Sequence, residues 1–139
     1  MIGLDTNVLA RYYIEDKQDG QAMSQRQAAR ALIESGRDLM VCKTVILELE
    51  WVMRGYYGFS SGDTVAVLRH LLSLTHITVE DRTGVENALS CCESGLDFAD
   101  ALHHASYRNC ESMMSFDDHR FARRAAKLGL VPAVRVPVA

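Results

Sequence analysis

Short apolar runs alternate with longer amphipathic stretches along the chain. Runs with the length of buried strands occur at 2–4, 39–42, 77–79 and 112–116. Stretches with helical periodicity occur at about 6–14, 23–35, 44–57, 63–74, 81–93, 98–108 and 118–127. A last apolar segment, 131–136, includes one proline and precedes another, which predicts a short edge strand.

This alternation predicts an α/β protein. Strands separated by helices form right-handed crossovers, and these produce a parallel sheet covered on both faces. We therefore expect a three-layer fold with a short central parallel β-sheet flanked by helices. The chain has no repeat and no linker, so residues 1–135 are expected to form a single domain.

Several residues predict where individual helices begin and end. Gly36 is expected to stop the second helix, and Asp63 to start the fourth. Thr44 is expected to cap the third helix. The inner stripe of that helix is predicted to consist of Val45, Leu49, Val52 and Tyr56.

Composition adds limits to this picture. Hydrophobic residues make up 48% and charged residues 24% of 139 residues, as in ordinary globular proteins. No apolar run reaches the length of a membrane span, and the N-terminal segment lacks the basic region of a secretory signal. The four cysteines show no metal-binding or disulfide spacing, which favours reduced thiols. We expect a cytoplasmic protein with no membrane association.

Carboxylates fall at the ends of several predicted strands. Asp5 follows the first strand and Asp117 the fourth, while Glu48 lies in the first turns of the helix after the second strand. Asp97 and Asp100 open the helix that leads into the fourth strand. Ligands of open parallel sheets bind beyond the carboxyl ends of the strands. The pattern thus predicts an acidic site at one edge of the sheet.

Helix capping is an alternative explanation for three of these acids. Asp5, Asp97 and Asp117 each precede a predicted helix and could accept hydrogen bonds from free backbone N–H groups. Glu48 is less easily explained, because its position predicts that it flanks a buried stripe. Glu50, four residues before Arg54, is expected to form a surface ion pair.

The spacing of the acids favours a hard cation. Asp97 and Asp100 lie one turn apart on the same helix stripe as His104, and paired carboxylates repel unless a cation lies between them. An all-oxygen ligand set suits Mg²⁺ or Mn²⁺. Zinc is disfavoured, because adjacent His103 and His104 point in different directions on a helix.

Four motifs, in this order, resemble the PIN-domain ribonucleases, and most closely the VapC toxins of toxin–antitoxin modules. They span nearly the whole chain, and each alone is weak. The motifs are Ile2-Gly3-Leu4-Asp5-Thr6-Asn7-Val8-Leu9, Val45-Ile46-Leu47-Glu48-Leu49-Glu50-Trp51-Val52-Met53, Asp97-Phe98-Ala99-Asp100-Ala101-Leu102 and Ser115-Phe116-Asp117.

The resemblance implies a metal-dependent endoribonuclease. It assigns a catalytic quartet consisting of Asp5, Glu48, Asp100 and Asp117. Asp5, Asp100 and Asp117 would bind Mg²⁺ or Mn²⁺, and Glu48 would act directly or through water. Further acidic or orienting positions are Asn7, Asp97, Ser115 and Asp118. The family often has Thr at the position of Ser115, and both residues supply a hydroxyl.

Phosphodiester hydrolysis explains why carboxylates are needed. The reaction requires a nucleophilic water, charge neutralisation and a stabilised leaving oxygen, and carboxylate-held Mg²⁺ supplies all three as one ion or two. One carboxylate can accept the proton of the water. The family pattern implies products with a 5′-phosphate and a 3′-hydroxyl.

The charge distribution is compatible with an RNA substrate. The net charge is −3, but without the six acids at and near the expected site the remainder sums to +3. Basic residues follow directly after Asp117 and could contact RNA phosphates. These are Arg120, Arg123, Arg124 and Lys127. A solvated helix face is the alternative interpretation.

The resemblance also implies protein partners. These are a VapB-type antitoxin, which would lie in a hydrophobic groove, and a second copy in a homodimer. The aromatic segment Trp51–Phe59 and the apolar side of the next helix could form that groove. That apolar side consists of Val65, Leu68, Leu71 and Leu72. Ordinary core packing is the alternative.

Other classes of function remain open. A haloacid-dehalogenase-type phosphatase also begins with a strand and an Asp, but it needs a second Asp where this chain has Asn7. A receiver domain needs an acidic pair on the first loop, where only Asp5 lies. A non-catalytic PIN-fold interaction module and an RNA-processing nuclease that is not a toxin are the main alternatives.

Overall fold

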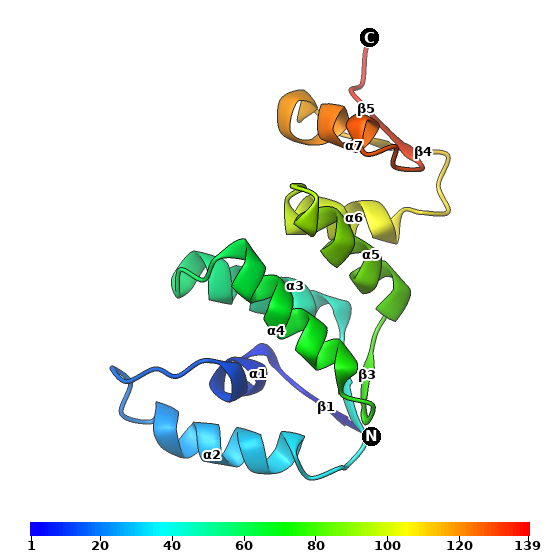
Figure 1. Ribbon diagram of the computed structural model, residues 1–139. Coiled ribbons are helices and arrows are strands. Elements are labelled where there is room, and N and C mark those ends of the chain that lie inside the picture. The colour runs from blue at the N-terminus through cyan, green and yellow to red at the C-terminus, as the bar shows by residue number, and fades with distance from the viewer. The chain divides into compact units, whose positions relative to one another are not determined.

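Five short strands and seven α-helices alternate along the chain, as the hydrophobic pattern predicts (Figure 1). The computed structural model describes all residues, 1–139. They form two compact units, Met1–Arg82 and Thr83–Ala139. The first contains β1 (Ile2–Gly3), α1 (Thr6–Tyr13), α2 (Ala22–Ile33), β2 (Leu39–Val41), α3 (Lys43–Trp51), the π-helical turn η1 (Val52–Tyr56), α4 (Ser61–Ser73) and β3 (Ile77–Val79). The second contains α5 (Arg82–Glu93), α6 (Phe98–Ser106), β4 (Ser112–Met114), the π-helical turn η2 (Asp118–Ala122), α7 (Arg123–Lys127) and β5 (Ala133–Arg135).

A parallel sheet organises the first unit. Its strand order is β1-β2-β3, and Leu39 of β2 pairs with Ile2 on one side and Ile77 on the other. Leu39 and Val41 are buried, as are Ile77 and Val79 in β3, so side chains at alternate positions face the core. The predicted parallel pairing is confirmed.

Helices α1 and α2 pack against each other, and α1 also contacts α3. Each of these three helices contributes buried side chains, which include Leu9 of α1, Ile33 of α2 and Leu49 of α3. Gly36 follows the end of α2 with φ +78°, a left-handed conformation that glycine adopts readily. The helix ends at Ile33, two residues before the predicted end at position 35, and Gly36 turns the chain shortly after it.

The predicted start of the third helix is wrong, and of its predicted inner stripe only Leu49 is fully buried. The N-cap of α3 is Cys42, and Thr44 lies within the helix. The buried positions are Ile46, Leu49, Glu50 and Met53. Val45 and Val52 of the predicted stripe are partly exposed, and Tyr56 is exposed. Most positions from 45 to 49 are apolar, so the sequence alone does not fix the helical phase.

The fourth helix begins two residues earlier than predicted. Its N-cap is Ser60, whose hydroxyl accepts a hydrogen bond from the backbone N–H of Asp63 at 3.0 Å. Asp63 therefore lies in the first turn, where its negative charge is favourable at the helix N-terminus.

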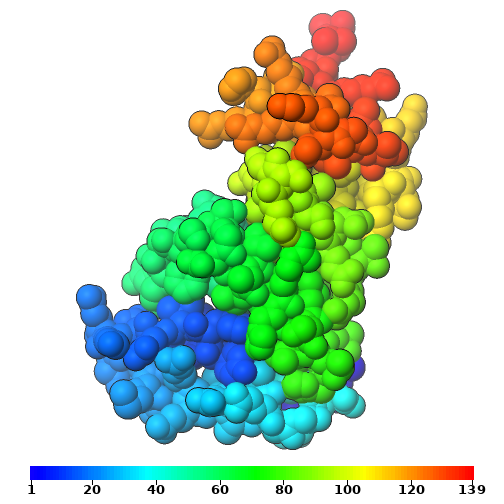
Figure 2. Space-filling model, viewed as in Figure 1, coloured from blue at the N-terminus to red at the C-terminus, as the bar shows by residue number.

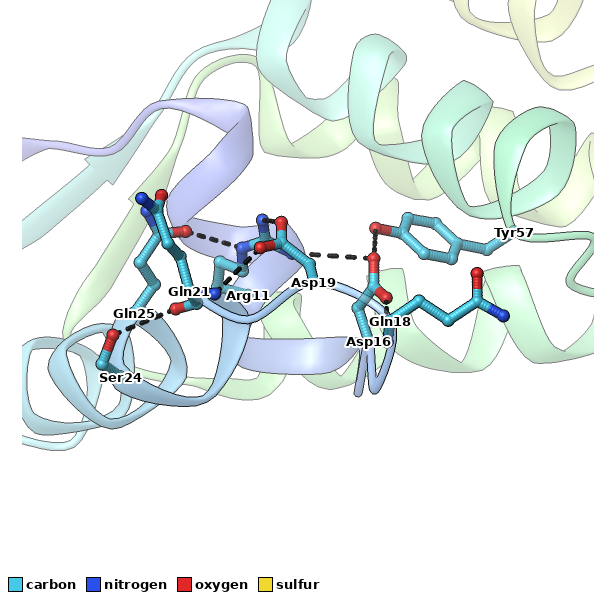
Figure 3. A network of polar contacts seen from close by, with 8 residues as sticks. All are labelled: Arg11, Asp16, Gln18, Asp19, Gln21, Ser24, Gln25 and Tyr57. Carbon is cyan, nitrogen blue, oxygen red and sulfur yellow. Dashed lines mark hydrogen bonds and ion pairs between the residues drawn. The ribbon is translucent and has the colours of Figure 1, made fainter.

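A polar network holds the loop between α1 and α2 (Figure 3). The Arg11 guanidinium forms an ion pair with Asp19 and donates a hydrogen bond to Gln25 Oε1 at 2.8 Å. The Tyr57 hydroxyl donates to Asp16 Oδ2 at 3.0 Å. The loop projects at the surface of the unit (blue in Figure 2). Polar contacts, instead of buried apolar side chains, therefore hold it in place.

We expect Arg11→Met to lower the melting temperature by roughly 3–6 °C, because it removes two charge-assisted contacts of a half-buried side chain. Thermal unfolding followed by circular dichroism measures this. The matched control is Arg26→Met, which removes an exposed ion pair with Glu15 at 3.8 Å and should have almost no effect. Equal losses in the two variants would contradict a structural role of the network.

The second unit is built on a two-stranded parallel ladder. Strands β4 and β5 pair from Ser112 opposite Ala133 to Met114 opposite Arg135, which confirms the predicted strand at 131–136. The core of this unit includes Leu89, Leu96, Phe98 and Phe121, contributed by its helices and their connections.

The histidine and cysteine side chains have structural surroundings in this fold. His104 is buried, and its Nε2 lies 2.8 Å from the Pro132 carbonyl oxygen, so the ring joins α6 to the start of β5. This is a structural role away from metal ligation. All four cysteines are free, which agrees with the expectation of reduced thiols.

Candidate metal and nucleic-acid site

Three of the predicted acids line one cavity in the second unit. Asp97, Asp100 and Asp117 surround a space of about 520 Å³. The remaining lining residues are Gly95, Arg120 and Arg124. Asp97 precedes α6, Asp100 lies in its first turn, and Asp117 follows β4 by a short turn. Two chain segments separated by the length of a helix and a strand therefore bring their carboxylates together.

Capping explains part of this arrangement. Asp97 Oδ1 accepts a hydrogen bond from the Asp100 backbone N–H at 3.2 Å, and Asp117 Oδ1 accepts one from the Arg120 N–H at 2.9 Å. Each bond uses one carboxylate oxygen, so capping and ligand binding are compatible. The prediction that Asp97 and Asp117 cap helices is confirmed.

The Asp100 carboxylate lies in the least favourable environment of the three. It is half-buried, and burial raises its pKa above the ordinary value. The negative charges of Asp97 and Asp117 raise the pKa further, and His103 opposes the change. These carboxylates are close enough to repel one another, which is the electrostatic situation that a bound cation relieves.

Two arginines line the same cavity, and neither forms an ion pair with its acids. Arg124 Nη1 donates to the Gly95 carbonyl oxygen at 3.0 Å, and the Arg120 side chain forms no ion pair. In contrast, Arg123 pairs with Asp118 at 2.8 Å. The predicted basic residues therefore divide: Arg120 and Arg124 line the cavity, whereas Arg123 and Lys127 do not.

Two further predicted residues can be placed around Asp117. The Ser115 hydroxyl accepts a hydrogen bond from the Asp117 backbone N–H at 3.1 Å. This bond fixes the turn that carries the carboxylate, which is the type of contact expected of an orienting residue. Asp118 forms an ion pair with Arg123 and does not line the cavity.

The first unit carries the other two acids of the predicted quartet. Asp5 follows β1 and caps α1, and its Oδ1 accepts from the Thr6 backbone N–H at 2.8 Å. Glu48 lies on α3, and both side chains are exposed to solvent. Asn7 lines a different cavity between α1 and α2, together with Val8, Arg11, Gln25, Ala28, Ala29 and Leu32.

The structure corrects the predictions for the two glutamates of α3. Glu48 does not flank the buried stripe but lies on the solvent side of the helix. Glu50 does pair with Arg54, at 2.7 Å, but its carboxylate is buried with 4% of the residue exposed. The ion pair replaces water as the partner of this buried charge.

Thr6 was not identified from the sequence as a distinctive residue. It is 5% exposed, and its hydroxyl has no hydrogen-bond partner in the structure. A buried hydroxyl without a partner is unusual, and this one lies directly between Asp5 and Asn7. Its position inside the first motif is the signal that could have drawn attention to it.

The donor set fits a hard divalent cation better than zinc. The cavity offers carboxylate oxygens, and His104 is already bonded to a backbone carbonyl. The structure holds no group of three or more His, Cys, Asp or Glu side chains in the close geometry of a complete metal-binding site. The cavity thus supplies ligands for a cation that would keep other ligands, such as water.

These features define a small α/β protein with parallel strands and a carboxylate cavity beside arginines. The sequence model of the PIN domain family matches residues 2–127, so the chain belongs to the PIN-domain family. The predicted fold class, a three-layer α/β fold of PIN type, is confirmed. A comparison with curated proteins finds none that matches.

Membership of this family sets the general chemistry. PIN domains are generally nucleases and typically use divalent metal ions. None of the helices combines the length and the hydropathy needed to cross a lipid bilayer.

Proposed function

We propose that the protein is a Mg²⁺- or Mn²⁺-dependent endoribonuclease and acts as the toxin of a toxin–antitoxin pair. The cavity of Asp97, Asp100 and Asp117 is the observation that carries the nuclease assignment, because its acids repel one another while two arginines lie beside them unpaired with acids. A cation relieves the repulsion, and the arginines are free to bind the phosphates of RNA.

The proposed catalytic residues are Asp5, Glu48, Asp100 and Asp117. Support comes from the family match, which spans all four in the order of the motifs. Asp5, Asp100 and Asp117 would hold the ion. When bound, Mg²⁺ or Mn²⁺ neutralises the phosphate charge and lowers the pKa of a bound water.

The protein side chains supply orientation and proton transfer. The backbone N–H groups that bond to Asp97 and Asp117 fix one oxygen of each carboxylate and leave the other available. One carboxylate of the quartet accepts the proton of the attacking water. Asn7, Ser115, Asp97 and Asp118 are proposed as supporting residues around that set.

We expect Arg120→Gln to weaken RNA binding roughly 3- to 10-fold and to reduce the salt dependence by about 0.7 in the logarithmic slope, the loss of one phosphate contact. Fluorescence anisotropy of labelled single-stranded RNA, measured with Ca²⁺ in place of Mg²⁺, gives both quantities. Arg37→Gln removes an exposed arginine outside the cavity and serves as the control. An unchanged slope in Arg120→Gln would contradict the proposed phosphate contact.

The toxin role and its partners rest on the resemblance to VapC proteins. We propose a VapB-type antitoxin, a homodimer, a cytoplasmic location and one PIN domain over residues 1–135 that includes both units. The predicted antitoxin groove needs revision, because Leu68, Leu71 and Leu72 of α4 are buried in the core. Trp51 and Tyr56 of the aromatic segment are exposed.

Cleavage of a closed circular RNA tests the endonuclease assignment directly. An endoribonuclease converts the circle into linear product in Mg²⁺, and an exonuclease or a non-catalytic interaction module leaves it intact. Expression in cells of the wild-type chain, and of variants in which the quartet acids are replaced, then separates a toxin from an RNA-processing nuclease. A toxin arrests growth only when the acids are present, whereas a processing enzyme does not arrest growth.

A further inference from the structure

We infer that Trp51 is a substrate-binding residue of the proposed ribonuclease, and that its indole stacks on an unpaired base of single-stranded RNA next to Glu48. The inference rests on the proposed function. The structural feature behind it is the solvent side of α3 and η1, which we call the Glu48 stripe. It consists of Thr44, Glu48, Trp51 and Gly55.

The Glu48 stripe lies opposite the buried side of its helix. Ile46, Leu49 and Met53 face the core and have no exposed surface. Residues three, four and seven positions apart lie on the same face of a helix. Trp51 therefore lies one turn after Glu48, on the face that points away from the core. The structure therefore excludes core packing as the role of this tryptophan: 57% of it is exposed to solvent.

The missing side chain of Gly55 makes room for the indole of Trp51. A Cβ atom at this position would lie 3.2 Å from Trp51 Cε2 and 3.3 Å from Nε1, closer than most real Cβ contacts. The glycine thus lets the ring lie against the backbone of η1, where one side is supported and the rest is open. A supported aromatic ring loses little conformational freedom when a ligand stacks on it.

Stacking is the interaction that such a ring offers to RNA. Every base has a flat apolar face, and aromatic side chains bind unpaired bases by covering it. Side chains at positions i and i+3 of a helix lie about 5–6 Å apart at Cβ. A base on Trp51 would therefore bring its own backbone phosphate toward Glu48, the proposed catalytic acid on the same helix.

The other exposed aromatic of this segment does not share the position. Tyr56 is 72% exposed, but its ring packs edge-on against Tyr57 with centroids 4.9 Å apart. It follows Glu48 by eight residues across a π-helical turn and is not part of the Glu48 stripe. Trp51 is thus the aromatic residue that the helix aligns with the candidate catalytic acid.

The test uses the fact that Trp51 is the only tryptophan of the chain. An RNA that wild-type protein cleaves in Mg²⁺ is bound to the full chain with Ca²⁺ in place of Mg²⁺, while tryptophan emission is recorded. We expect saturable quenching of the emission. An oligonucleotide with abasic sites around the cleavage position should bind more weakly and quench less.

Variants separate stacking from a general effect on the fold. Trp51→Leu should weaken binding by about tenfold and raise KM more than it lowers kcat. Trp51→Phe, which keeps an aromatic face, should retain most of the affinity. Tyr107→Leu, at an exposed aromatic in the second unit, is the matched control and should bind like wild type. Circular dichroism confirms that each variant is folded.

Three results would overturn the inference. One is cleavage by wild type with no change in emission on RNA binding, together with wild-type KM in Trp51→Leu. A second is equal weakening in Trp51→Leu and Trp51→Phe while both remain folded. The third is Trp51 emission that changes with protein concentration in the absence of RNA and does not change when RNA is added. That result would assign the Glu48 stripe to an interface between two copies of this chain. If no RNA is cleaved or bound at all, the proposed ribonuclease function fails first.

Discussion

Replacement of Asp100 by asparagine is expected to reduce RNA cleavage by roughly 1,000-fold or more, since it removes the charge that would hold the metal ion. The same change should not lower stability in the metal-free protein. Burial and the neighbouring acids Asp97 and Asp117 raise the pKa of the Asp100 carboxyl above its unfolded value, so its ionisation opposes folding as the pH rises through this range. At neutral pH, Asp100→Asn should therefore melt at the same temperature as wild type or higher.

Single-turnover cleavage and thermal unfolding, measured on the same preparations, test both parts of this prediction. Glu111→Gln is the control, because it removes an exposed carboxylate of the same unit outside the cavity. Cleavage by Asp100→Asn at a rate within a few-fold of wild type would remove Asp100 from the proposed catalytic set. A large loss of stability would show that the carboxylate is structural.

Metal binding should stabilise the protein measurably. A ligand at 100 times its dissociation constant adds about 2.7 kcal/mol to the free energy of unfolding, which for a chain of this size raises the melting temperature by roughly 6–10 °C. We expect Mg²⁺ or Mn²⁺ to produce this shift and EDTA to reverse it. The physical reason is that the cation removes the repulsion within the carboxylate cavity.

Asp117→Asn distinguishes binding in the cavity from binding elsewhere. Asparagine can replace the cap to the Arg120 N–H, so the fold should persist while the metal-dependent shift is largely lost. Wild-type protein whose melting temperature does not respond to millimolar Mg²⁺ or Mn²⁺ would contradict the assignment of the cavity as a metal site.

Much of the fold follows from local sequence patterns. The apolar runs locate all five strands, and glycine and polar residues mark most helix ends, because turn and cap chemistry is local. The phase of α3 could not be predicted, since its apolar residues are nearly continuous. The π-helical turns η1 and η2 were also missed, because one extra residue in a turn leaves no clear mark on hydrophobic periodicity.

The candidate site was predictable only in part. The positions of Asp97 and Asp117 before helix starts indicated their capping bonds, and the strand ends indicated that both acids gather with Asp100 in one cavity. Which glutamate of α3 is buried could not be predicted, because the exchange of Glu48 for Glu50 depends on helical phase and on the ion pair with Arg54. The lack of an acid partner for Arg120 is a tertiary property and leaves no sequence signal.

A cleavage assay with and without metal tests whether the protein hydrolyses RNA by means of metal ions held on its carboxylates. Labelled single-stranded RNA is incubated with the purified protein in Mg²⁺ or Mn²⁺ and in EDTA, alongside Asp5→Asn. This variant keeps an oxygen that can accept the bond from the Thr6 N–H but loses the charge. We expect cleavage by wild type only with metal, and none by the folded variant. Equal inactivity of folded wild type and variant across several RNAs, or cleavage that persists in EDTA, would contradict it.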